Sequence, residues 1–250
     1  MSFGSNIKSD LYKIFHTPIW FIHLMIPIIG IMLFLWYYSI SPWDELSKLS
    51  GYIQILSVAF PLLIAIITSI LSEIEQKAGA FYSVLTTVNK KSIPHISKIV
   101  LLVALGGMSA LFALLGFGIG FTELGYHTFP IIFYIKTAAL LLISVIPLYL
   151  LHYAISFIFG KGFNIGLGIV GSLVSALLLT GLGDGMWFCI PWGIAGRFSE
   201  NLLRSKLLNT TFFQQTDVVK SIIFLFLFSV FFTVAIVLLF NKWEGRKSDD

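Results

Sequence analysis

Residues 51–72 read GYIQILSVAFPLLIAIITSILS, and the segment that follows, residues 73–98, reads EIEQKAGAFYSVLTTVNKKSIPHISK. The first stretch is long and apolar enough to cross a bilayer core of about 30 Å, which takes about 20 residues. The second stretch interrupts a nearly continuous apolar sequence with charged and polar residues. This succession predicts a helix that spans a membrane and is followed by a segment outside the membrane.

The composition of the whole chain agrees with that interpretation. Hydrophobic residues make up 57% and charged residues only 11%, whereas a soluble domain carries roughly a quarter charged residues. The chain is therefore expected to be an integral membrane protein. Its net charge of +4 fits anchoring at an anionic membrane surface. Nucleic-acid binding is not expected, because no basic patch with interleaved exposed aromatics lies outside the apolar runs.

Six apolar stretches are long enough to span a membrane. They are residues 19–40, 51–72, 99–121, 131–159, 165–182 and 221–240. No internal repeat or linker divides them, so we expect an all-α, polytopic membrane protein with a single membrane domain over residues 1–250.

The distribution of Lys and Arg predicts the orientation. Six spans place both termini on one side of the membrane. Ten of the 16 Lys and Arg residues then share that side, and four of the other six lie in one long loop, which counts less in the positive-inside rule. We therefore expect both termini in the cytoplasm.

The N-terminal segment, residues 1–18, carries a helical pattern between residues 6 and 17. Ile7, Leu11, Ile14 and Phe15 lie at helical spacing, with Lys8 and Lys13 on the other side. This pattern is typical of an amphipathic helix on the inner membrane surface. An ordinary polar flank before the first span is the alternative.

The 73–98 segment is predicted to contain a short helix over residues 72–88. Ser72 would cap it, and Glu73 and Glu75 would occupy its first turn, where the helix dipole favours anions. Its apolar stripe consists of Phe81, Leu85 and Val88, with Tyr82 alongside. Such a helix suits docking into a groove on a soluble protein. A solvated loop is the alternative.

The loop over residues 183–220 begins with GDGMWFCIPWGIAGRF. This run is too apolar for a solvated loop, yet Asp184, Pro191, Arg197 and its glycines prevent a clean span. We expect a re-entrant or interfacial hairpin with Trp187 and Trp192 at headgroup depth; a simple aromatic belt explains the two indoles equally well. The second half, residues 199–220, is polar enough to lie in water.

Several familiar chemistries lack their motifs. The sequence contains no Walker A motif, no HExxH and no Cys/His set with zinc spacing, so no catalytic or metal-binding residue is expected on this chain. A GxGxxG pattern over residues 166–171 lies inside an apolar run without a preceding strand, so it indicates close helix packing instead of dinucleotide binding. Within the spans, Lys136 and His152 lie near the ends, and no acidic residue lies midway.

The order of these elements resembles that of ABC-2-type exporter permeases. The segment from Glu75 to Gly79 has the E-x-x-x-G pattern of that family's coupling helix, although Val88-Asn89-Lys90-Lys91 replaces the usual residues after it. Closer still, Gly183-Asp184-Gly185-Met186-Trp187 with Pro191-Trp192 is similar to the permease subunits of lantibiotic-immunity ABC transporters.

This resemblance implies a permease of a bacterial cell membrane that exports a lantibiotic peptide. Its expected partners are a separate ATPase subunit, usually a homodimer, which binds the ATP; a second, related permease or a second copy of this chain; and membrane lipid. The residues expected to contact the ATPase are Glu73, Glu75, Gly79, Phe81, Tyr82 and Leu85. Those expected at an outer gate or peptide site are Asp184, Trp187, Pro191, Trp192 and Arg197. An exporter of another drug, peptide or lipid, and a membrane scaffold or sensor that transports nothing, are the alternatives.

Overall fold

The computed structural model describes residues 3–86, 91–208, 210–214 and 216–245, and within these ranges the chain forms helices and turns but no strand. Six helices are long and apolar enough to cross a membrane. They are α2 (Pro18–Ile40), α3 (Glu45–Lys77), α5 (Ser92–Glu123), α6 (Ile131–Ile158), α7 (Lys161–Leu178) and α9 (Thr216–Lys242). The prediction of an all-helical protein with six potential membrane spans is therefore confirmed.

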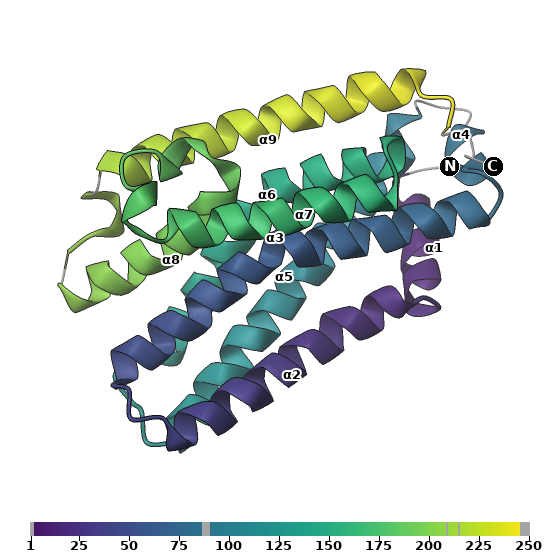
Figure 1. The fold of residues 1–250 in the computed structure, drawn as a ribbon. Coiled ribbons are helices and arrows are strands. Elements are labelled where there is room, and N and C mark those ends of the chain that lie inside the picture. The colour runs from purple at the N-terminus through teal and green to yellow at the C-terminus, as the bar shows by residue number, and fades with distance from the viewer. Residues whose placement is uncertain (1–2, 87–90, 209, 215, 246–250) are drawn as a thin grey trace.

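Shorter elements close the two ends of the bundle. They are α1 (Phe3–Phe15), α4 (Tyr82–Leu85), α8 (Pro191–Leu207) and the 3-10 turns η1 (Gly181–Gly183), η2 (Trp187–Cys189) and η3 (Phe212–Gln214). Figure 1 shows α1, α4 and the end of α9 together, with α1 crossing that end steeply relative to α2. We call this the near end. The far end holds the start of α3, the start of α9 and the elements around η1 and η2 (Figure 1).

Small residues let the spanning helices pack closely, as the GxGxxG interpretation predicts. A Cβ on Gly168 of α7 would lie 2.5 Å from the Cβ of Ala65 in α3. One on Gly171 would lie 2.4 Å from the indole nitrogen of Trp192. Distances below 3.0 Å leave no room for a side chain, so these glycines are required for the contact that α7 makes with α3 and α8.

The fifth span differs from its predicted position. Residues 165–182 were expected, but α7 begins at Lys161 and ends at Leu178, four residues earlier at each end. Asn164 is fully buried and its amide contacts Ala65, Thr68 and Ser69 of α3 at 2.9 Å. Because partners inside the bundle satisfy its polar groups, a residue that hydropathy excludes from a span lies within one.

Candidate functional site

The connection between α3 and α5 differs from the predicted helix over residues 72–88. Ser72 does not cap a helix: it is buried inside α3 and donates to the Ser156 carbonyl of α6 at 2.9 Å. α3 continues to Lys77 because residues 73–77 are mostly good helix formers, so Glu73 and Glu75 lie in its last turns and not in a first turn. α4 has only four residues. Residues 87 and 88, the last two of the predicted helix, lie outside the described residues.

A tight turn follows α3. Gly79, Ala80 and Phe81 have φ values of +119°, +49° and +66°, and the last two are unfavourable for residues with a side chain, by about 1–3 kcal/mol each. The Phe81 ring is 1% exposed and lies 4.9 Å from Trp243 and 5.7 Å from Phe157 between ring centroids. Burial of such a ring contributes about 1.5–3 kcal/mol, enough to offset strain at that residue.

This geometry corrects the predicted docking stripe. Phe81 points into the bundle, so its ring does not fill a groove on another protein in this conformation. Glu75 is also buried, whereas Glu73 and Leu85 are half-buried. Gly79 is exposed, and Tyr82 is 69% exposed. The accessible part of the predicted surface is therefore the turn around Gly79 and Tyr82.

Four charged side chains meet beneath this turn. Glu75 lies 3.0 Å from Lys98 of α5 and 3.1 Å from Lys13 of α1, and Lys98 also pairs with Asp10 of α1. Asp10, Glu75 and Lys98 are each less than a tenth exposed. We call Asp10, Lys13, Glu75 and Lys98 the ion cluster. Its formal charges cancel, which is the condition under which buried charges are tolerated, and it joins α1, α3 and α5.

The ion cluster also changes the interpretation of α1. The predicted helix is present, but its inward face holds Asn6, Asp10 and Ile14, which are all buried. Phe15, predicted on the apolar face, is 57% exposed, and Lys13 turns toward Glu75. The apolar pattern predicted the wrong inward face. Asp10 lies on the inward face because it pairs with Lys98 and accepts a hydrogen bond from the Ser97 hydroxyl at 3.1 Å inside the protein.

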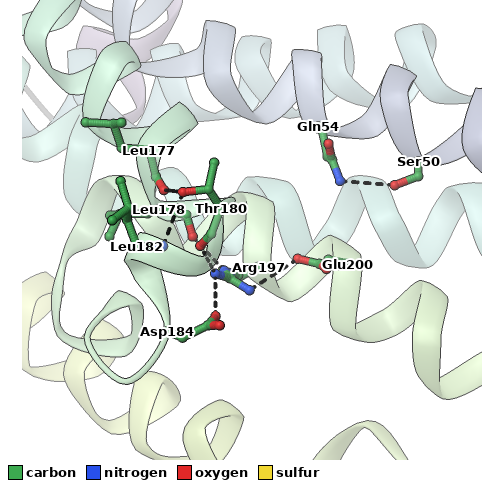
Figure 2. A network of polar contacts seen from close by, with 9 residues as sticks. All are labelled: Ser50, Gln54, Leu177, Leu178, Thr180, Leu182, Asp184, Arg197 and Glu200. Atoms are coloured by element: carbon green, nitrogen blue, oxygen red, sulfur yellow. Dashed lines mark hydrogen bonds and ion pairs between the residues drawn. The ribbon is translucent and has the colours of Figure 1, made fainter.

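At the far end, Arg197 of α8 holds the chain that follows α7 (Figure 2). Its guanidinium donates to the carbonyls of Leu178 and Thr180 at 2.6 and 2.7 Å and to the Asp184 carboxylate at 2.8 Å. Glu200 lies 3.6 Å away on the other side. Arg197 thus satisfies the carbonyl of Leu178, the last residue of α7, which has no partner within the helix. It is a second donor to the Thr180 carbonyl, which also accepts from the Gly183 N–H at 3.0 Å, and the Asp184 side chain remains 70% exposed.

The two predicted headgroup tryptophans pack within the protein. Trp187 is 5% exposed and meets Phe198 edge to face at 6.2 Å, and Trp192 lies against α7 at Gly171. Pro191 is the first residue of α8, a position that does not require its missing N–H. Asp184 and Arg197 are therefore brought together, whereas Trp187 is separated from the surface.

Residues 199–207 were expected in water but continue α8. Ser199, Leu203 and Ser205 are buried against the bundle. The two hydroxyls donate to carbonyls of their own helix, to Ala195 at 2.9 Å and to Leu202 at 2.8 Å. The polar composition predicted a segment in water. Hydrogen bonds within the helix lower the free-energy cost of burying a serine hydroxyl, so these serines can face the bundle.

A groove of about 770 Å³ opens between α2, α3 and α8. The side chains that decide its character are Tyr37, Tyr38, Trp43, Ser47, Ser50, Gln54, Ile55, Glu200 and Arg204. Ser47, Ser50 and Gln54 follow one face of α3, and the Gln54 amide donates to Ser50 at 3.1 Å (Figure 2). Gln54 lies about 14 Å along α3 from its first residue, at 1.5 Å per residue. We call this the far-end groove.

The far-end groove extends along α3. Gln54 and Ile55 also line a second groove of about 550 Å³ between α3 and α7, which reaches Ser172 and Thr180. A polar stripe at this depth in a spanning helix is tolerated where it faces protein, water or a polar ligand. The stripe is visible in the sequence as three polar residues at helical spacing. The groove itself is not, because its other walls come from α2 and α8, which are separate segments of the chain.

A second buried polar group lies between α6 and α7. His152 donates from Nδ1 to the Asn164 side-chain oxygen at 2.8 Å, and both residues are fully buried. Together with the α3 contacts of Asn164, this bond joins three helices and gives His152 a structural role.

Comparison with protein-family models, with curated proteins and with solved structures finds no match. Within the described ranges, no group of three or more His, Cys, Asp or Glu side chains is arranged to hold a metal ion. The candidate functional regions therefore lie at the two ends of the bundle: the Gly79–Tyr82 turn next to the ion cluster, and the far-end groove next to Arg197.

Proposed function

We propose that this chain is the membrane-spanning subunit of an exporter that a separate ATPase drives, and that it expels a lantibiotic-type antimicrobial peptide from a bacterial cell membrane. The observation that carries the proposal is the far-end groove. Its aromatic wall suits the apolar side chains of an amphipathic peptide, and the stripe of Ser47, Ser50 and Gln54 suits peptide backbone groups. Asp184 does not line the groove, but it binds Arg197, which also lies 3.6 Å from the groove's Glu200, and its 70% exposed side chain leaves carboxylate surface for a cationic residue.

The proposal places the near end in the cytoplasm, in keeping with the Lys and Arg distribution. There the ATPase, expected to be a homodimer that binds the ATP, would contact the turn around Gly79 and Tyr82. α3 connects this turn to the far-end groove as one helix of 33 residues, and the ion cluster holds its near end against α1 and α5. A second permease, either related or another copy, would complete the path.

The groove is tested by cysteine accessibility. In a Cys189→Ser background, Gln54→Cys should react with a membrane-impermeant thiol reagent added from the far side, because a path for a polar cargo admits water. Phe226→Cys is the matched control: it lies at a similar depth from the start of α9 and is 67% exposed on a helix with few buried residues. Equal protection of the two cysteines would contradict an open path.

Coupling is tested by comparing two tyrosines at the near end. Tyr82 and Tyr12 are each 69% exposed, so an aspartate at either position should be tolerated by the fold. Tyr82→Asp should abolish copurification of the proposed ATPase subunit and cell protection against the peptide, since aromatic anchors carry about 2 kcal/mol or more at interfaces. Tyr12→Asp should preserve both. Protection that persists without ATP hydrolysis would instead indicate a scaffold or sensor.

A further inference from the structure

A separate pocket of about 430 Å³ lies at the far end between α6 and α8. Two lysines distant in the sequence line it, Lys136 of α6 and Lys206 of α8, together with the hydroxyl-bearing residues Ser205 and Thr210. The chain returns to α8 after its end, because the Thr210 N–H donates to the Ser205 carbonyl at 3.0 Å. We call this the lysine pocket. It is distinct from the far-end groove, with which it shares no lining residue.

The charge of the lysine pocket is not balanced by the protein. No Asp or Glu lines it, and neither Lys136 nor Lys206 has an ion pair or a side-chain hydrogen bond to any of the residues that the structure describes. Among the other far-end cations, Lys220 lies 3.2 Å from Asp217, Arg197 lies 2.8 Å from Asp184, and Lys48 donates to the Tyr38 carbonyl at 2.9 Å. Arg204 has no such partner among the described residues, but it lines the far-end groove, to which Glu200 adds a negative charge. Two unpaired positive charges in one pocket are a site for an anion.

The position of Lys136 indicates where that anion comes from. It is the sixth residue of α6, a spanning helix, and it is exposed. At about 8 Å from the first residue of that helix, its ammonium extends to the level of lipid headgroups. The other walls of the pocket, Ile132, Phe133, Leu202 and Phe212, are apolar, which suits the glycerol and first methylenes of a lipid.

We propose that the lysine pocket binds the phosphate-bearing headgroup of an anionic phospholipid in the leaflet at the far end. Both ammonium groups, and the Thr210 hydroxyl, donate to the phosphate oxygens. This site is independent of the exporter proposal, because it uses another face of α8 and another helix.

The test measures binding of phosphatidylglycerol to the full chain by native mass spectrometry, with phosphatidylcholine, which is zwitterionic and has no net charge, as the comparison. Lys136→Gln or Lys206→Gln alone should weaken phosphatidylglycerol binding about fivefold, and the double change about 30-fold. Replacement of both by Arg should keep the binding. Lys220→Gln, which removes a positive charge at the same end but outside the pocket, should leave it unchanged.

Three results would overturn the proposal: equal binding of the two lipids, an equal loss in Lys220→Gln, or unchanged binding in the double Gln variant. Inorganic phosphate distinguishes the source of the anion. If it displaces phosphatidylglycerol at equal concentration, the pocket holds free phosphate and the lipid assignment is wrong. Failure to displace it supports the lipid.

Discussion

Replacement of Lys98 by Met should destabilise the protein by about 3–5 kcal/mol, the cost of leaving a buried charge without its partner. The Lys98 side chain is 5% exposed and is shared by Asp10 and Glu75, which are 8% and 1% exposed. For the 3.0 Å pair with Glu75, Coulomb attraction at an effective dielectric constant of 20 is about 5.5 kcal/mol before desolvation is subtracted. Glu75 keeps Lys13 after the change, whereas Asp10 loses its cation.

A second substitution separates charge from packing. Asp10→Asn in the Lys98→Met background restores a neutral ion cluster, so it should recover about 1–3 kcal/mol of the loss. Lys161→Met is the matched control. Its pair with Glu73 has the same chemistry at the same end, but the two side chains are 51% and 33% exposed, and solvent screening reduces such pairs to about 0–1 kcal/mol.

The free energy of unfolding would be measured for the unchanged protein, Lys98→Met, Asp10→Asn, the double variant and Lys161→Met in mixed micelles, by titration with SDS and tryptophan fluorescence. The reasoning fails if Lys98→Met costs no more than Lys161→Met. It also fails if the double variant is as unstable as the sum of its two single changes, because then the charges do not interact.

Two further comparisons test particular contacts. Arg197→Gln should lower the free energy of unfolding by about 2–4 kcal/mol and raise hydrogen exchange between residues 181 and 190, because it removes charge-assisted bonds to two carbonyls. Asp184→Asn changes an exposed side chain and should cost under about 1 kcal/mol. Equal effects of the two changes would show that the carbonyl bonds of Arg197 contribute no more than its ion pair. Gly168→Ala should destabilise by about 1–3 kcal/mol through its 2.5 Å approach to Ala65. A Cβ on Gly166 would have no atom within 4 Å, so Gly166→Ala should instead stabilise the protein by up to about 1 kcal/mol. If the two changes shift the free energy of unfolding in the same direction, the close contact between α7 and α3 at Gly168 is contradicted.

The sequence-based prediction was accurate where one local quantity decides the outcome. Pro18 and Ile131 begin two spanning helices within a residue of the predicted starts. It was wrong where a polar group has a distant partner. Ser72 was assigned to a helix start because the sequence does not reveal its hydrogen bond to Ser156. The fifth span was predicted four residues too late because the sequence does not reveal that Asn164 forms hydrogen bonds to α3 inside the bundle.

The candidate site divides in the same way. The 73–98 segment and the 183–220 loop were recognised as the unusual parts of the chain. Asp184 and Arg197 were both named among the residues of an outer gate or peptide site, but their contact was not foreseen, and that role stays a prediction. Phe81 was selected as a docking residue, yet three successive positive φ values turn it inward. The far-end groove and the lysine pocket were not predicted, because their walls come from α2, α3, α6 and α8.

The sequence by itself determined that this chain forms six helices long and apolar enough to cross a membrane, because transfer of apolar side chains and satisfaction of backbone hydrogen bonds are summed along about 20 consecutive residues. Only the tertiary structure decided which charges are buried and which surfaces remain open. Asp10 and Lys98 meet across 88 residues, and Lys13 and Glu75 across 62. A charge inside a membrane protein is tolerated only beside its partner, so its position follows from the fold and not from local composition.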